Sequence, residues 1–421
     1  MTSSQPQQAG FSPQRLARVD RLLERYVQSG LLAGILGIIY RKGEVAYANA
    51  VGMRERETNR PMTEDTIFRI YSMTKPITAV AALMLYEDGR FLLDDPIASY
   101  IPEFDDVRVY SGDMENLETP DRPINVKDLF MHTAGLTYGW DQEHPVEELY
   151  RKTIGDTEQL NLEKFVERIA SLPLLYHPGS RWIYSYATDV LGRLVELLSG
   201  QSLDRFFRRE IFAPLGMNDT AFHLPPDSVD RFAACYWPPG GKMGPGAPPS
   251  PRPDFDRPYD LANLGEPKFE LQDAPAASRY TRPPLFLSGG GGLVSTAGDY
   301  LRFAQMLLNG GVLDGNRLLG RKTVEMMCAN HLPAGLIPIQ VGPTPDRGYG
   351  FGLGVSVLTD PPASSQPGSV GTYGWGGAAT TQFWIDPAEE MIGLLMAQFF
   401  PFDYYPIARE FRLAAYQALV D

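Results

Sequence analysis

Ser72 and Lys75 form the spacing in this chain that most directly suggests chemistry, a serine and a lysine three residues apart. The apolar, alanine-rich run 78–86 predicts a helix that begins near this pair, and Gly89 is a stop signal. Because residues three apart share one face of a helix, the Ser72 hydroxyl and the Lys75 amine can meet. The pair could act as nucleophile and base, with the positive end of the helix dipole beside a developing oxyanion.

The same two residues also fit a helix-capping serine followed by a surface lysine, so other residues must decide between the two interpretations. Tyr184 lies just before an apolar helical pattern that includes Val190, Leu191 and Leu194. A tyrosine at that position can point into a cleft, although a tyrosine at a helix end more often simply packs. The segment 372–379 is rich in glycine and precedes the strand expected at 380–385. Its glycines permit a ligand to approach the backbone closely.

Strand patterns at the two ends of the chain predict one antiparallel sheet. A helix that begins at Ser12-Pro13 is followed by two strands that form a hairpin, and the last third repeats a strand-rich pattern before a final helix. The segment between them, 76–222, reads mostly as helices and loops. The expected strands are 33–40, 44–51, 349–358, 379–385 and 391–398, and the final helix is 406–419.

Composition restricts the class of protein. The 421 residues (46.8 kDa) exceed a typical single domain, and a net charge of −13 argues against nucleic acid or an anionic membrane as a partner. Cys235 and Cys328 lie outside any metal-binding or redox spacing, so no disulfide, metal or cofactor is expected. The polar N-terminus has no secretory pattern and no apolar run reaches membrane length, which predicts a cytoplasmic protein.

Taken together and in this order, the three stretches resemble the serine hydrolases related to class C β-lactamases and penicillin-binding proteins. Within that superfamily the chain looks most like the family VIII carboxylesterases, from about residue 11 to about residue 418. The resemblance implies an α+β, β-lactamase-like fold, in which an antiparallel sheet is flanked by N- and C-terminal helices and carries an inserted, mainly helical lobe. Further stretches agree with it, namely 129–136, 178–179, 214–217 and 291–296.

The resemblance also implies roles for individual residues. Ser72 would be the acylated nucleophile, with Lys75 and Tyr184 as its proton-transferring partners. An unperturbed lysine has a pKa near 10.4 and a tyrosine one near 10, so neither is an effective base at pH 7 unless the fold changes these values. The remaining roles go to an oxyanion hole formed by the backbone N–H groups of Ser72 and Ala378, and to substrate-binding positions at Trp375, Gly376, Gly377 and Tyr138.

Two departures from the β-lactamase pattern favour ester hydrolysis. Trp375 stands where those enzymes carry a lysine that binds a substrate carboxylate, and Tyr186 stands where class C enzymes carry an asparagine. We therefore expect hydrolysis of short-chain esters, with weak or no β-lactam turnover. An acyltransferase, a β-lactamase or peptidase-like enzyme and a binding protein of the same descent remain alternatives. A Ser-His-Asp hydrolase would need a Gly-x-Ser-x-Gly elbow, which is missing, and His132 is interpreted as structural.

The resemblance divides the chain into two domains. Residues 1–75 and 286–421 would form the domain that contains the sheet, and 76–285 the mainly helical lobe. Within the lobe, 237–258 is rich in proline and glycine and predicts a long exposed loop, as compatible with a plain insertion as with a substrate lid. The expected partner is a small-molecule ester, and the oligomeric state is left open.

Overall fold

The two ends of the chain build one antiparallel sheet, as expected. The computed structural model describes residues 6–155, 157–240, 260–342 and 344–421, and its main sheet has the strand order β10-β11-β12-β13-β14-β1-β2-β3. The strands are β1 (Gly34–Arg41), β2 (Glu44–Glu55), β3 (Arg60–Pro61), β10 (Tyr349–Phe351), β11 (Ser356–Leu358), β12 (Tyr373–Gly377), β13 (Thr381–Asp386) and β14 (Met391–Ala397).

The centre of the sheet is the pair β1 and β14, in which Ile38 lies opposite Leu394. Every residue of both strands is buried. Side chains alternate between two apolar clusters, so that Leu36 and Ile38 belong to one face and Ile35 and Ile39 to the other. The continuous apolar runs of these strands therefore reflect a sheet that is covered on both sides.

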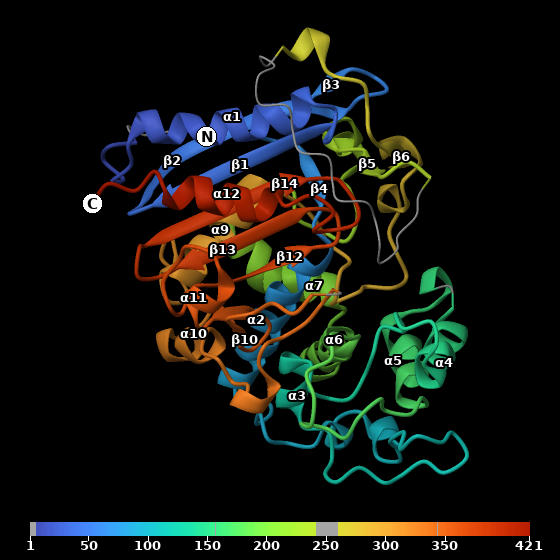
Figure 1. The fold of residues 1–421 in the computed structure, drawn as a ribbon. Helices are drawn as coiled ribbons and strands as arrows, with labels where there is room; N and C mark the ends of the chain where they lie inside the picture. Colours follow the sequence, from blue (N-terminus) through green and yellow to red (C-terminus); the bar gives the residue numbers. More distant parts are fainter. Residues whose placement is uncertain (1–5, 156, 241–259, 343) are drawn as a thin grey trace.

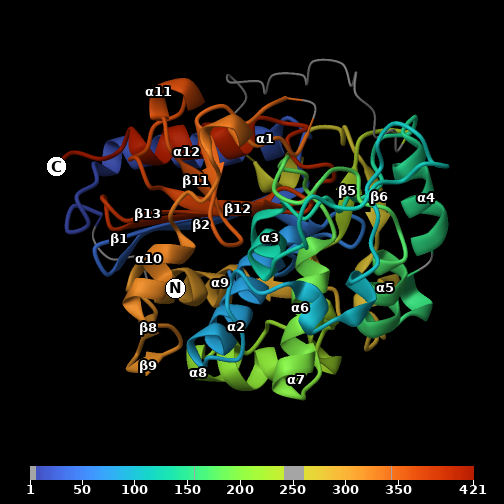
Figure 2. The same cartoon turned by 90° about the horizontal axis from the view of Figure 1, so that it is seen from below.

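Helices from distant parts of the sequence cover the two faces, and Figures 1 and 2 show the resulting layers. On one face lie α1 (Pro13–Gln28) and α12 (Ile407–Tyr416), and on the other α2 (Thr74–Glu87) and α9 (Ala297–Leu308). The start of α1 follows the sequence signal, because the Ser12 side chain accepts a hydrogen bond from the Arg15 N–H and Pro13 opens the helix.

The inserted segment is helical, as its sequence predicts. Between residues 76 and 222, the regular elements of the described chain after α2 are helical: α3 (Val126–Met131), α4 (Pro145–Ile154), α5 (Leu162–Ala170), α6 (Ala187–Ser199), α7 (Leu203–Phe207) and α8 (Ala213–Leu215), with short 3-10 and π turns. One buried apolar cluster joins this lobe to the sheet, since it contains Leu36, Leu129 and Val190. The domain boundaries near 75 and 286 stay a prediction.

Short strand pairs complete the fold: β4 (Ile67–Arg69) with β7 (Val294–Thr296), β5 (Cys235–Trp237) with β6 (Glu270–Asp273), and β8 (Val312–Leu313) with β9 (Asn316–Arg317). Two short helices, α10 (Arg321–Met327) and α11 (Pro361–Ser364), lie near the end of the chain. Most of the expected loop 237–258 falls in 241–259, outside the described residues. Within the described ranges, no helix is long and apolar enough to cross a membrane.

One expectation about the strands was wrong. The segment 349–358 is not one strand but the antiparallel pair β10 and β11, because the chain turns at Gly352 and at Gly354, whose φ of 92° favours glycine. The glycine-rich segment before β13 is itself a strand, β12, in which Trp375 lies opposite Phe383. The turn comes later, at Thr380, with a φ of 60°.

Candidate active site

Ser72 and Lys75 meet as predicted. Ser72 lies in a 3-10 turn, Tyr71–Met73, that leads directly into α2, where the Lys75 side chain is buried with 1% of its surface exposed. Lys75 Nζ donates a hydrogen bond to Ser72 Oγ at 3.3 Å and another to the Gly290 carbonyl at 2.5 Å. Burial of the amine excludes the alternative of a capping serine followed by a surface lysine.

The turn that carries Ser72 is held in an uncommon conformation. Tyr71 has a φ of 42°, in the left-handed region that non-glycine residues rarely adopt. Its neighbour Ile70 is anchored by a hydrogen bond from its N–H to the Leu293 carbonyl. Gly377 packs tightly on the same turn, since a Cβ there would lie 2.3 Å from the Ile70 carbonyl oxygen. The end of β12 therefore approaches the Ser72 turn as closely as backbone allows.

Tyr184 lies above Lys75. It precedes α6 by three residues, its side chain is almost buried, and Lys75 Nζ lies 4.6 Å from the centroid of its ring. The hydroxyl of Tyr184 accepts a hydrogen bond from Trp375 Nε1 at 3.3 Å. The structure thus brings the three predicted sequence stretches to one place, although Tyr184 faces Lys75 with its ring and Trp375 with its oxygen.

Backbone at the end of β12 completes this part of the site. Ala378 follows the strand directly, is half-buried, and its carbonyl accepts a hydrogen bond from the Phe402 N–H at 2.7 Å. Gly376 lies on β12 beside Phe402, where a Cβ would come within 3.1 Å of that ring. The predicted Trp375, Gly376, Gly377 and Ala378 therefore form one continuous edge next to the Ser72 turn.

Asp189 is a site residue that the sequence analysis missed. Its carboxylate, buried on α6, accepts hydrogen bonds from Ser288 Oγ at 2.6 Å and from the Gly290 N–H at 3.0 Å, and the Gly290 carbonyl in turn accepts from Lys75. Burial raises the pKa of Asp189, and the charge of Lys75 opposes that shift. The available signal was a carboxylate within the apolar helical pattern after Tyr184.

His132, interpreted as structural from the sequence, ends a helix and also contacts the site. It ends α3 with a left-handed φ of 57°, and its ring centroid lies 4.8 Å from that of Tyr184. Burial lowers the pKa of His132 well below its usual range, and the charge of Lys75 lowers this pKa further. A neutral imidazole therefore packs behind Tyr184, with its Nδ1 3.3 Å from Ser185 Oγ.

Aromatic rings also lie close to the buried Lys75 amine. The Tyr138 ring centroid lies 5.5 Å from Lys75 Nζ and 5.2 Å from the ring of Tyr184, which places this predicted pocket residue at the site. Burial raises the pKa of Tyr138 well above its usual range, so its phenol stays neutral. Tyr186 packs on Tyr138 at 4.3 Å, and burial, followed by the charge of Asp189, raises the pKa of Tyr186 to about 12.

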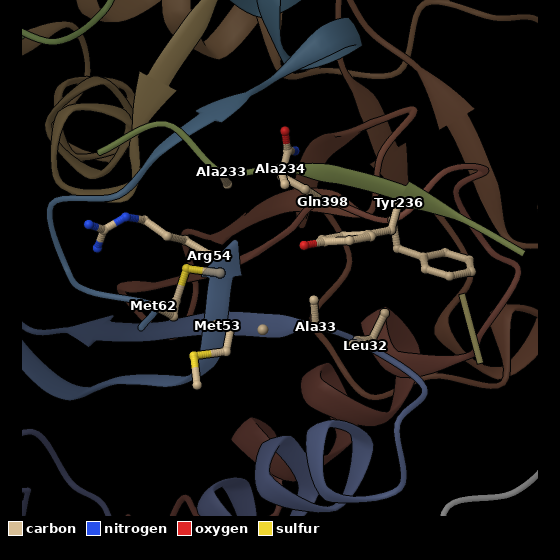
Figure 3. A pocket seen from close by; sticks show the side chains of 11 residues that line it. Leu32, Ala33, Met53, Arg54, Met62, Ala233, Ala234, Tyr236 and Gln398 are labelled. Atoms are coloured by element: carbon tan, nitrogen blue, oxygen red, sulfur yellow. The ribbon is translucent and has the colours of Figure 1, made fainter. Parts of the chain in front are cut away.

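Two hollows lie elsewhere in the fold. The one in Figure 3, with a volume of about 10 Å³, is lined by Arg54, Tyr236 and Gln398 among others and has room for about one water molecule. The second, of about 390 Å³, is lined by residues that include Glu103 and Leu172. Ser72, Lys75 and Tyr184 line neither. No group of three His, Cys, Asp or Glu side chains suited to hold a metal occurs among the described residues.

The fold and its relatives define the class of protein as an esterase-type serine hydrolase with a β-lactamase-like fold. The chain belongs to the β-lactamase family, because the sequence pattern of that family matches residues 19–417. This membership confirms the fold class and the resemblance predicted from the sequence.

Individual relatives match over most of their length. Esterase EstB of Burkholderia gladioli is 34% identical over 385 residues, which cover 90% of this chain and 89% of EstB. Protein Rv1367c of Mycobacterium tuberculosis H37Rv is 34% identical over 387 residues, which cover 89% of this chain and 87% of that protein. The solved structure of EstCE1, described as a hydrolase with promiscuous acyltransferase activity, is similar with a TM-score of 0.77 and 30% identity, over 96% of this chain and 99% of EstCE1.

Proposed function

We propose that the protein is a serine carboxylesterase that hydrolyses short-chain carboxylic esters through an acyl-enzyme on Ser72. The observation that carries this proposal is the buried amine of Lys75, 3.3 Å from Ser72 Oγ and 4.6 Å from the centre of the Tyr184 ring. Removing a lysine amine from water is costly, and placing it beside a serine hydroxyl is a common way to prepare a nucleophile. The similarity to an enzyme named an esterase supports the same substrate class.

In the proposed reaction the Ser72 oxygen attacks the ester carbonyl carbon, and the serine proton moves to the pair of Lys75 and Tyr184. The bond to the alcohol oxygen then breaks, and the pair returns the proton to that departing oxygen. In the second half, water attacks the acyl carbon and gives a proton to the same pair. The bond between that carbon and Ser72 Oγ then breaks, the pair returns the proton to Ser72 Oγ, and the carboxylic acid leaves. Lys75 serves either as the proton acceptor or as the cation that favours negative charge on the Tyr184 oxygen.

The proposed oxyanion hole consists of the backbone N–H groups of Ser72 and Ala378, from the turn before α2 and from the end of β12. Both positions are half-buried, and Gly377 brings the two segments into backbone contact. Donors held in place by a packed backbone stabilise the tetrahedral intermediate without reorganising, and loss of one such donor typically costs about 10²–10³ in kcat.

Selectivity for esters over β-lactams is proposed to come from Trp375 and Tyr186. Trp375 packs at 5.5 Å on Tyr184 and 5.2 Å on Phe351, and its only polar atom is directed to the Tyr184 hydroxyl. A neutral indole at this position offers no positive charge to a substrate carboxylate, and Tyr186 offers no side-chain amide. Both changes favour an uncharged ester over an anionic drug.

The direct test uses p-nitrophenyl acetate and a chromogenic cephalosporin, with product release and intact-protein mass followed in parallel. We expect nitrophenol release with little cephalosporin opening, and an acetyl adduct that the Ser72→Ala variant does not form. Lys75→Ala and Tyr184→Phe should lower turnover by about 10²–10⁴, the usual worth of general-base help. Near-normal turnover in any of the three variants would contradict the assignment, and fast cephalosporin opening would make the protein a β-lactamase.

A second candidate is acyl transfer on the same scaffold, with an alcohol in place of water in the second half-reaction. EstCE1, which is 30% identical to this chain, is described as a hydrolase with promiscuous acyltransferase activity, and this similarity supports acyl transfer as the second candidate. The two functions are distinguished by adding an alcohol acceptor to the ester assay and measuring the new ester against the free acid.

A further inference from the structure

Trp140 is an aromatic side chain left in contact with solvent beside the proposed reaction centre. Its side chain is 55% exposed, and among the described residues every other Trp, Tyr and Phe is buried or half-buried. The indole stacks on Tyr138, with ring centroids 5.1 Å apart and an angle of 14° between planes. It also lies 5.7 Å from the Tyr184 ring. The exposed indole of Trp140 therefore lies next to Tyr184, and the ring of Tyr138 separates it from Lys75.

The backbone on both sides of Trp140 is clamped by α4. Arg151 donates hydrogen bonds to the carbonyls of Gly139 at 2.7 Å and of Asp141 at 2.6 Å. The buried carboxylate of Glu147 accepts the Asp141 N–H at 2.7 Å. Three bonds from one helix to two residues hold this segment in place, so the indole is presented at a fixed position. A preorganised aromatic surface binds a partner with little loss of conformational entropy.

We propose that Tyr138 and Trp140 form the subsite for the alcohol half of the ester and that this subsite prefers a planar aromatic group. The inference rests on the proposed function, in which Tyr184 returns a proton to the departing alcohol oxygen. A group that does so must come within hydrogen-bond reach of that oxygen. The substituent on the oxygen then lies next to Tyr184, whose hydroxyl has Trp375 on one side. The ring of Tyr184 has Tyr138 at 5.2 Å and the exposed Trp140 at 5.7 Å, and these two rings are the neighbouring surfaces that lead out to solvent.

The chemistry of the surface favours a neutral aromatic ring over the other candidates. Two rings that already stack in parallel offer a flat face on which a third ring gains stacking contacts that an alkyl group does not make. Aromatic surfaces also attract cations, but Lys75 Nζ lies 5.5 Å from the Tyr138 centroid and 4.6 Å from the Tyr184 centroid. A second positive charge there would be repelled by protonated Lys75, which disfavours an ester whose alcohol part carries an ammonium group.

The test compares benzyl acetate with cyclohexylmethyl acetate, two esters with the same acyl group and similar alcohols that differ in the aromaticity of one ring. We expect wild type to prefer the benzyl ester in kcat/KM, and Trp140→Ala to lower that preference by about 3- to 10-fold, the range expected for one aromatic pair. Trp140→Phe, which keeps a ring, should retain most of the preference. Leu413→Ala is the matched control, because Leu413 is equally exposed at 56% but lies on α12, across the sheet from the site.

The other outcomes are also decisive. An unchanged preference in Trp140→Ala, with normal hydrolysis of ethyl acetate, would overturn the subsite and leave the esterase function intact. A second pair of esters, ethyl phenylacetate and ethyl cyclohexylacetate, carries the ring in the acyl half. If Trp140→Ala changed the preference within that pair instead, the assignment of the subsite to the alcohol half would be overturned. Failure of wild type to hydrolyse any of these esters would count against the proposed function itself.

Discussion

At the scale of single residues, Asp189 is expected to act through Lys75 as a positioning residue. Its ionised carboxylate orders Gly290, whose carbonyl holds Lys75 Nζ. Because burial raises the pKa of Asp189, esterase activity should fall on acidification at a higher pH than an ordinary aspartate would give. Asp189→Asn should lower kcat by about 10- to 100-fold, the worth of a charged hydrogen bond, and should flatten that acidic limb. Asp299→Asn is the control, because Asp299 is another buried aspartate whose pKa is raised, and this substitution should leave the pH profile of activity unchanged.

The residues that the sequence predicted best are those with a local pattern. Ser72 and Lys75 are three apart, in the turn before α2 and in its first turn, and their spacing alone predicts that they meet. The stretches that contain Tyr184 and Trp375 are recognisable by their neighbouring residues. Asp189 was missed because its partners, Ser288 and Gly290, lie a hundred positions away and no local spacing links them. The catalytic roles of Ser72, Lys75 and Tyr184 stay predictions until the variants are measured.

At the scale of elements, the contact between β12 and the Ser72 turn sets the geometry of the proposed oxyanion hole. A Cβ at Gly377 would lie 2.3 Å from the Ile70 carbonyl oxygen and 2.3 Å from Thr381 Oγ1. Gly377→Ala should therefore push β12 away from the turn, lower kcat, and lower the free energy of unfolding by about 1–3 kcal/mol in urea denaturation. Gly335→Ala is the control, because nothing lies within 4 Å of a Cβ there. Equal effects of the two substitutions would argue against the contact.

Elements with strong end signals were predicted well, and those that depend on tertiary contacts were not. Ser12 and Pro13 mark the start of α1, and the hairpin of β1 and β2 is evident from its turn. The segment 349–358 reads as a single strand, but Gly354 lies so close to α2 that a Cβ there would be 2.6 Å from the Ala79 Cβ, and the chain turns there instead. Strand β12 could not be predicted from its own residues, because glycine is unfavourable in strands and only the pairing with β13 overrides that preference.

At the scale of the whole molecule, Arg41 joins both ends of the chain to the sheet. Its buried guanidinium, at the end of β1, donates to the Ala9 carbonyl at 3.0 Å, to Glu389 Oε2 at 2.8 Å and to Asp421 Oδ1 at 2.5 Å. The sequence predicted a sheet made from both ends, since strand patterns are concentrated there and the middle reads mostly as helices and loops. It could not predict this junction, because each of the four residues lies at least 32 positions from the others in the sequence.

Arg41→Met is therefore expected to lower stability without changing catalysis. Loss of the hydrogen bonds to Ala9 and Glu389 should cost on the order of 1–3 kcal/mol, seen as a lower midpoint of thermal unfolding. Hydrogen bonds from Lys42 and then Arg41 lower the pKa of Asp421 to about 2, so its stabilising contribution is present above the ordinary aspartate pKa and is lost as the pH falls towards 2. This acid-sensitive part of stability should shrink in Arg41→Met. By contrast, kcat/KM for p-nitrophenyl acetate at 25 °C should stay within about twofold of wild type, since Met73 and Ile77, on either side of Lys75, pack in the apolar cluster on the opposite face of the sheet. A large loss of activity in folded Arg41→Met would mean that the junction of the two ends also shapes the active site.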